Sequence, residues 1–168
     1  METFWAGAWA SAFGTVMGGL MLSAAFFILK EYVFQRPQIT GIWECQLITQ
    51  RTCYSPFAGM SLWYRVTLVQ NGDEIVGYAE KDRESATGGA RSYSGADRCP
   101  VEILGSVEKN YLSPDRIYLS WVEQAAHRKS SSVFKLSVSE SKNTGDLIGH
   151  YQSTIANSSG RASWCRCN

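Results

Sequence analysis

Two patterns of hydrophobic and polar positions divide the chain near Pro37. No charged residue occurs from Phe4 to Leu29. A helix of that length would reach roughly 39 Å, which exceeds the ~30 Å hydrocarbon core of a bilayer. From Thr40 onward the hydrophobic period is two, which is typical of strands with one buried face. The sequence therefore predicts an N-terminal transmembrane helix followed by a strand-rich domain.

A cleavable signal peptide is the alternative for the apolar segment. A signal peptide has a basic start and a shorter apolar stretch, whereas Glu2 is the only early charge here. A buried core helix fits less well, because large rings would occur on every face, at Trp5, Trp9, Phe13, Phe26 and Phe27. We therefore expect a retained anchor over residues 1–31, a juxtamembrane linker over 32–38 and a folded domain over 39–168.

The orientation of the anchor depends on a few charges. Lys30 and Arg36 flank its C-terminal end, and no Lys or Arg precedes it. Because positive residues stay on the cytoplasmic side, this pattern predicts a single-pass protein with a cytoplasmic C-terminal domain. The five cysteines are odd in number and lack zinc-site spacing (Cys45, Cys53, Cys99, Cys165 and Cys167). Such a set indicates reduced thiols more readily than a disulfide framework.

Small residues recur along the anchor at Gly7, Ser11, Gly14 and Gly18, at spacings of four, three and four. This spacing puts them on one stripe of a helix, where small side chains let two helices approach closely in lipid. We expect this stripe to support self-association. The alternative is that small residues are simply common in membrane helices.

The remaining pattern predicts eight short antiparallel strands. Asn71-Gly72 is expected as a two-residue hairpin turn, and residues 83–100 as a polar, Gly-rich loop that acts as a lid hinged at Gly88-Gly89. The expected strands cover residues 40–49, 62–68, 74–81, 101–107, 116–127, 133–139, 147–155 and about 161–167. This spacing predicts an all-β, eight-stranded up-and-down antiparallel barrel, or a sandwich, preceded by the transmembrane helix.

No catalytic or metal-binding constellation is visible in the sequence. The two histidines, His127 and His150, lie on different expected strands without metal-ligand spacing, and no nucleophile or phosphate-loop motif occurs. The net charge is only +1, so no global field attracts DNA or RNA. We therefore expect a protein that is not an enzyme, with no cofactor and no metal.

The remaining candidate chemistry is recognition by aromatic and cationic side chains. Aromatic faces stack on bases, and Arg forks pair with phosphate oxygens. The expected ligand-binding residues on the strands are Tyr64, Arg65, Tyr78, Trp121, Arg128 and Tyr151. The alternative for each aromatic residue is an ordinary place in the hydrophobic core.

Two short motifs resemble the lipocalin-like barrels. Gly41-Ile42-Trp43 opens the first expected strand, and Trp164-Cys165-Arg166 lies in the last one. In barrels of this kind a Trp near the start plugs one end and an Arg near the chain's end stacks across it. The resemblance implies that Trp43 and Arg166 close the barrel.

The whole layout resembles the transmembrane-plus-barrel effectors of bacterial anti-phage signalling. The resemblance implies an inner-membrane homo-oligomer whose barrel binds a cyclic di- or oligonucleotide made by a cognate nucleotidyltransferase, and which then damages membrane lipid. This chain departs from relatives that carry two membrane helices, because only one span is visible. Two alternatives remain, an envelope protein that binds a lipophilic ligand and a structural membrane subunit without a ligand.

Overall fold

The computed structural model describes residues 2–30, 37–110, 113–125, 128–138 and 146–167. For residues 2–8, 10, 96, 125 and 128 only the backbone is described. The chain divides into two compact units, Met1–Arg36 and Pro37–Asn168, and each unit is described by itself. Most of the expected linker, 32–38, lies outside the described residues.

The first unit contains one long helix, α1 (Glu2–Ile28). Its segment Ser11–Ile28 has a mean hydropathy of 1.7 and none of it is buried within the protein. The helix is therefore long and apolar enough to cross a membrane, as the sequence predicts. Large apolar side chains such as Phe13, Leu22 and Phe26 are exposed along it, which in water would be unfavourable.

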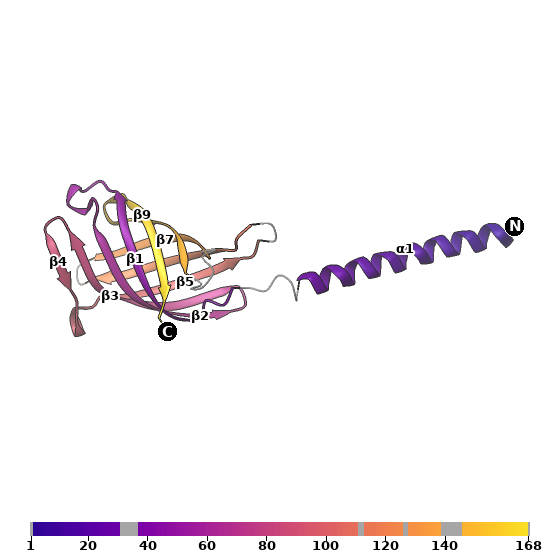
Figure 1. Ribbon diagram of the computed structural model, residues 1–168, viewed down its shortest axis with the longest axis horizontal. Helices are drawn as coiled ribbons and strands as arrows, with labels where there is room; N and C mark the ends of the chain where they lie inside the picture. Colours follow the sequence, from indigo (N-terminus) through magenta and orange to yellow (C-terminus); the bar gives the residue numbers. More distant parts are fainter. Residues whose placement is uncertain (1, 31–36, 111–112, 126–127, 139–145, 168) are drawn as a thin grey trace. The chain divides into compact units, whose positions relative to one another are not determined.

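The second unit is a closed barrel of eight antiparallel strands (Figure 1). Every strand pairs with the next in the barrel, and β1 pairs with β9 to close the ring, so the topology is up-and-down. The barrel strands are β1 (Gly41–Arg51), β2 (Ser61–Asn71), β3 (Glu74–Ala86), β5 (Pro100–Glu108), β6 (Arg116–Ala125), β7 (Arg128–Val138), β8 (Leu147–Ser153) and β9 (Ser158–Arg166). A ninth strand, β4 (Gly89–Ser92), pairs only with β3. The predicted barrel is confirmed, and closure leaves the eight strands without an open sheet edge.

Glycines allow the strands to bend into this ring. A Cβ at Gly149 would lie 2.0 Å from the carbonyl oxygen of Lys135, and one at Gly160 would lie 1.9 Å from that of Ile48. Both positions face inward, where neighbouring backbones cross closely. Any side chain there would push adjacent strands apart, so these glycines set the curvature of the wall.

The period-two pattern fixes which residues form the core. In β1 the side chains of Trp43, Cys45, Leu47 and Thr49 are buried, and the residues between them are more exposed. The same alternation places Ile117, Leu119 and Trp121 of β6 inside. The period of two in the sequence therefore matches the alternation of buried and exposed side chains in these strands.

The expected turn at Asn71-Gly72 is wrong by one residue. Asn71 still pairs with Glu74, so the two loop residues are Gly72 and Asp73. Gly72 has a φ of +63° and Asn71 has no positive φ. A glycine in the first loop position is sufficient for a tight hairpin, so Asn71 needs no positive φ.

The expected loop over residues 83–100 is largely a β-hairpin. Strand β3 continues to Ala86 and β4 returns beside it, followed by the short 3₁₀ helix η3 (Gly95–Asp97). Side-chain interactions hold this hairpin in place: Lys81 is paired with Glu84 at 2.6 Å, and Lys81 and Arg91 lie over the Tyr93 ring. Polar composition alone indicates a loop, but the Lys81–Tyr93 contact between the two arms helps to stabilise an exposed hairpin.

Strand β7 also begins earlier than expected. The sequence predicts this strand from residue 133, but in the structure it starts at Arg128. Strand β8 ends at Ser153, and Ile155–Asn157 form the 3₁₀ helix η4 instead of more strand. Ser and Lys residues are weak strand formers, so pairing with β6 outweighs local propensity here.

Candidate functional site

One end of the barrel is closed by Trp43 and Arg166. The Arg166 guanidinium lies 5.0 Å from the centre of the Trp43 ring. One of its Nη atoms donates to the carbonyl oxygens of Gln38 and Thr40, at 2.6 and 3.1 Å. The buried Trp43 indole in turn donates to Ile39 O at 2.9 Å. Arg166 therefore joins the last strand to the segment that leads into β1, and this is the geometry that the lipocalin-like resemblance implies.

An aromatic cluster fills the middle of the barrel. The Trp121 ring lies 4.5 Å from Phe134, 5.1 Å from Tyr64 and 5.5 Å from Trp164, centre to centre. Tyr151 stacks on Phe134 at 6.0 Å. Edge-to-face and stacked rings of this kind pack the interior firmly. Neither the Trp121 nor the Trp164 Nε1 donor has a hydrogen-bond partner within the described part of the chain.

The other end of the barrel holds a small cavity of about 40 Å³ with a mixed apolar and polar wall. Its wall carries rings, hydroxyls and one carboxylate. The lining residues include Thr49, Tyr64, Trp121, Glu123, Ser132, Tyr151, Ser153 and Ser158. A volume of this size holds a few water molecules, whereas sites for drug-sized ligands occupy roughly 300–1,000 Å³. A larger ligand must therefore displace part of the wall.

Hydrogen bonds between side chains cross this cavity. The Thr49 and Tyr151 hydroxyls lie 2.7 Å apart, and both residues are buried. The Tyr64 hydroxyl donates to Glu123 Oε2 at 3.4 Å, a long contact. Burial, followed by the nearby Glu123 charge, raises the pKa of Tyr64 well above its usual value. Tyr64 is therefore a neutral donor at physiological pH.

Two connections cover the cavity, and we refer to them together as the lid. The first is residues 52–60, between β1 and β2, and the second is residues 154–157, between β8 and β9. Phe57 and Met60 of the first connection and Ile155 of the second line the cavity. The Cys53 N–H donates to Ala156 O at 2.8 Å and ties the two connections together. Ala156 has a φ of +49°, a conformation that a non-glycine residue adopts at an energetic cost.

The structure brings together three of the six expected ligand-binding residues. Tyr64, Trp121 and Tyr151 all line the cavity. Arg65 and Tyr78 lie on the outer wall, where Tyr78 is 71% exposed, so they do not share the interior with the three rings. The side chain of Arg128 lies outside the described residues. No Lys or Arg is among the residues that line the cavity in the described part of the barrel.

Sequence reasoning missed the most polar residue of the cavity, Glu123. It lies two positions after Trp121 in β6, so the period-two pattern that places Trp121 inside also places Glu123 there. The lid residues gave no comparable signal, because Phe57 and Met60 belong to an irregular segment.

The helix stripe is open to a partner. A Cβ added at Gly14 or Gly18 would meet no atom within 4 Å, and Ser11 is exposed. Ser11 also accepts a hydrogen bond at its carbonyl oxygen from Thr15 Oγ1, at 3.0 Å. Only the backbone is described for Gly7.

The fold and the site together define a closed antiparallel barrel with a lidded cavity, preceded by a helix that could span a membrane. Comparisons with protein-family models, with curated proteins and with solved structures give no match for this chain.

Proposed function

We propose that the chain is a membrane-anchored receptor and effector of bacterial antiviral defence, which binds a cyclic di- or oligonucleotide at the lidded end of its barrel. The observation that carries the proposal is the combination of ring faces, hydroxyls and one carboxylate within a single lidded cavity. The layout of an anchor followed by a small barrel supports the same conclusion through its resemblance to anti-phage effectors.

The chemistry of the cavity suits a nucleobase. Tyr64 and Trp121 offer aromatic faces, and a stacked base contributes about 1–3 kcal/mol of binding energy. The Glu123 carboxylate accepts hydrogen bonds from ring N–H and amino groups at the edge of a base. The Trp121 indole N–H, which has no partner among the residues described, is a donor for a base carbonyl or ring nitrogen.

The phosphates would lie at the mouth of the cavity. The lining residues of the cavity include no cation in the part that the structure describes, and the Glu123 carboxylate would repel a phosphate. In this arrangement the lid opens, the base enters and the phosphate ring remains near the exposed hydroxyls and amides of the lid. Arg65 and Tyr78, on the outer wall, have no part in it.

Ligand binding would be coupled to the membrane through the oligomer. A ligand shifts an equilibrium only if it binds one state more tightly than another. The lid supplies two such states, closed over a small cavity or open around a base. The small-residue stripe of α1 would then associate into the assembly that disrupts the inner membrane.

Calorimetry on the full chain in detergent tests the proposal. The probes are a panel of cyclic di- and trinucleotides that differ in their bases, at low and at high salt. We expect at least one to bind, with little effect of salt on a base-dominated interaction. Glu123→Gln should weaken that binding by roughly tenfold or more, because a carboxylate contact to a base edge is lost. Glu102→Gln, a matched change on the outer wall, should leave it unaltered.

A second function is favoured by one observation, the small volume of the cavity. A barrel with only about 40 Å³ of free interior could serve as a structural membrane subunit without any ligand. The absence of heat from every nucleotide, together with unchanged thermal unfolding in their presence, would support that function and refute the receptor.

A further inference from the structure

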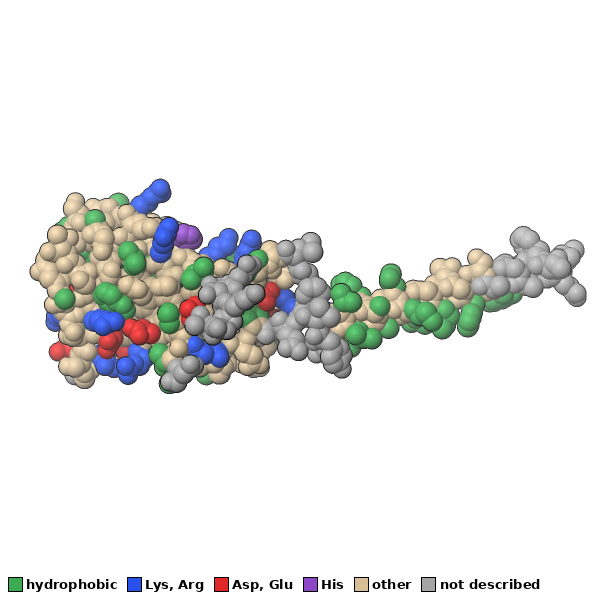
Figure 2. Space-filling view, in the orientation of Figure 1, with side chains coloured by type: hydrophobic (Ala, Val, Ile, Leu, Met, Phe, Trp, Pro, Cys, Tyr) green, Lys and Arg blue, Asp and Glu red, His purple; other side chains and the backbone are tan. Residues whose placement is uncertain are grey.

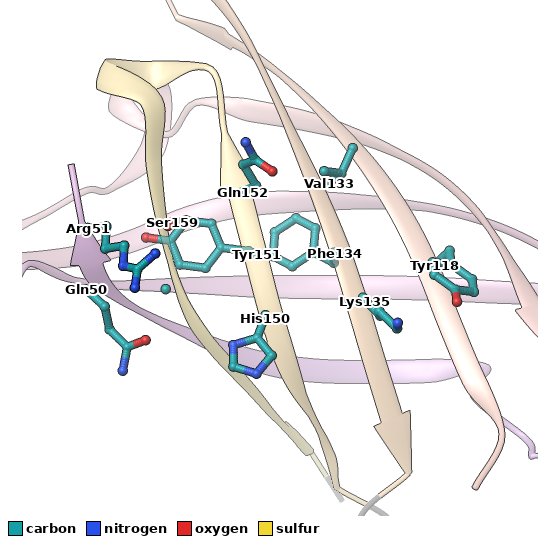
Figure 3. A pocket seen from close by; sticks show the side chains of 11 residues that line it. Gln50, Arg51, Tyr118, Val133, Phe134, Lys135, His150, Tyr151, Gln152 and Ser159 are labelled. Carbon is teal, nitrogen blue, oxygen red and sulfur yellow. The ribbon is translucent and has the colours of Figure 1, made fainter. Parts of the chain in front are cut away.

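A row that contains two cations, Lys135 and Arg161, crosses the outer wall of the barrel. Lys135 of β7 pairs in register with His150 of β8, and His150 pairs with Arg161 of β9. Tyr118 of β6 and Ile48 of β1 continue the row on either side. All five side chains are exposed. Figure 3 shows Tyr118, Lys135 and His150 side by side on neighbouring strands. We call this surface the basic face.

The basic face has the form of a docking surface. Shallow grooves of about 580 and 590 Å³ lie beside the row, and both are lined by Lys135 and His150. Val133 and Ile148, each about half exposed, add apolar contacts. No outward position that the structure describes on β7, β8 or β9 carries Asp or Glu. Figure 2 shows the histidine among blue side chains along one edge of the barrel. Lys135 and Arg161 place two positive charges on either side of His150, so this surface suits an acidic partner.

The outer wall formed by β2, β3 and β5 has the opposite character. Val69, Val76 and Leu104 pair in register as an apolar row, and they are 51%, 49% and 65% exposed. Tyr78 lies beside this row. Exposed carboxylates lie around it at Glu74, Glu102 and Glu108, while Glu80 is already paired with Arg98 at 2.8 Å. We call this surface the acidic face. An exposed apolar centre with a polar rim is typical of a protein-binding surface.

The two faces lie on opposite sides of the barrel. The strand order around the ring is β2-β1-β9-β8-β7-β6-β5-β3, closed by pairing of β2 with β3. Strand β3, at the centre of the acidic face, is therefore four strands from β8, at the centre of the basic face, in both directions. A net charge of +1 conceals this separation of charge.

We propose that barrels associate head-to-tail, with the basic face of one copy docked on the acidic face of the next. Because the two faces differ and lie opposite one another, this contact is heterologous and each copy can bind two neighbours. The result is a line of barrels. The contact does not depend on the nucleotide, so it holds even if the barrel has no ligand.

A second copy of the chain would cover both the basic face and the acidic face, whereas an anionic membrane would cover only the basic face. Lipid headgroups would neutralise Lys135, His150 and Arg161 but would leave the acidic face and its apolar row uncovered. A second copy covers both faces at once, pairs their opposite charges and buries apolar side chains from each. Complementary charges of this kind also fix which surfaces meet.

The test uses the full chain in detergent with Gly14→Ile added, so that helix pairing contributes little. The measured quantity is the distribution of oligomer masses at low salt. Two variants each block one face, Lys135→Glu and Glu102→Lys. Each alone should weaken association by roughly tenfold or more through like-charge contact. Gln46→Glu, on β1 two strands from the central strand of each face, is the matched control and should associate normally.

Mixing the two variants gives the decisive result. The Lys135→Glu chain keeps its acidic face and the Glu102→Lys chain keeps its basic face, so an equimolar mixture should associate more tightly than either variant alone. The double variant in one chain should recover part of the longer assemblies. Association that none of these changes alters, or a wild-type protein that stays monomeric at low salt, would overturn the proposal. Loss of binding to phosphatidylglycerol vesicles in Lys135→Glu, without any change in mass, would assign the basic face to the membrane instead.

Discussion

The hydrogen bond between Thr49 and Tyr151 allows a quantitative test of the cavity. Tyr151→Phe keeps the ring that packs on Phe134 and removes only the hydroxyl, which lies 2.7 Å from Thr49 Oγ1. Thr49 is 2% exposed and Tyr151 is 5% exposed, so neither hydroxyl reaches bulk solvent when its partner is removed. We expect Tyr151→Phe to destabilise the barrel, because the Thr49 hydroxyl is left buried without a partner.

The magnitude follows from the cost of an unsatisfied buried hydroxyl, about 1–3 kcal/mol. Thr49→Val, which removes the other hydroxyl and keeps the shape, should cost a similar amount. The double variant leaves neither hydroxyl unpaired, so it should cost less than the sum of the two, by about 1 kcal/mol. For a domain of this size, 1 kcal/mol corresponds to a Tm change of roughly 3–5 °C.

The assay is thermal unfolding of the full chain in detergent, followed by near-ultraviolet circular dichroism of the buried rings. If the double variant is destabilised by the sum of the two single effects, the reasoning is refuted, because the two hydroxyls would then not depend on each other. A double variant as stable as the wild type is compatible with it, since an apolar pair can replace a hydrogen-bonded one.

Three further predictions concern other parts of the chain. Gly14→Ile or Gly18→Ile should reduce crosslinked oligomers without changing the barrel's ligand affinity, since a branched side chain separates the helices. Unchanged crosslinking in both variants would show that the stripe has no part in association. Arg166→Ala should lower the Tm more than Arg166→Lys, because Lys keeps a charge over the Trp43 ring; equal losses would show that the charge is irrelevant. Burial raises the pKa of Glu84, but hydrogen bonds with Lys81 and Tyr93 outweigh it and lower the pKa below 4.5. The contribution of Glu84 is therefore present above the usual pKa of a glutamate and is lost as the pH falls through the lowered value. Amide exchange in the β3–β4 hairpin, corrected for intrinsic rates, should accelerate in that acidic range and not near neutrality.

The barrel could be predicted from the sequence because a strand with one buried face repeats every two residues. Trp43, Cys45 and Leu47 in β1 show this, and so do Ile117 and Leu119 in β6. A closed ring buries one side of every strand, so the same signal recurs throughout the domain. The hairpin at β4 could not be predicted in this way, because its four residues are all exposed and no alternation marks them.

The candidate site was only partly predictable, for a related reason. The sequence identifies Tyr64, Arg65 and Tyr78 as residues able to bind a ligand but gives no direct measure of which way each points. Tyr64 turns inward because it has the parity of Val66 and Leu68, whereas Arg65 has the opposite parity. Tyr78 lies between the inward positions Gly77 and Ala79. Which residues share the basic face or the acidic face depends on the register in which neighbouring strands pair. That register is known only once the strands are paired in the barrel.

The central claim, that a ligand enters beneath the lid, is tested most directly by locking the lid. Cys53 N–H donates to Ala156 O at 2.8 Å, so Ala156→Cys adds a second thiol close to Cys53, and oxidation is expected to join the two connections. Cys99, Cys165 and Cys167 are replaced by Ser, and Cys45 is kept because it is fully buried. We predict that the oxidised protein binds none of the cyclic nucleotides that the reduced protein binds, and that a reductant restores binding. Equal affinity in the locked and reduced states would contradict the account.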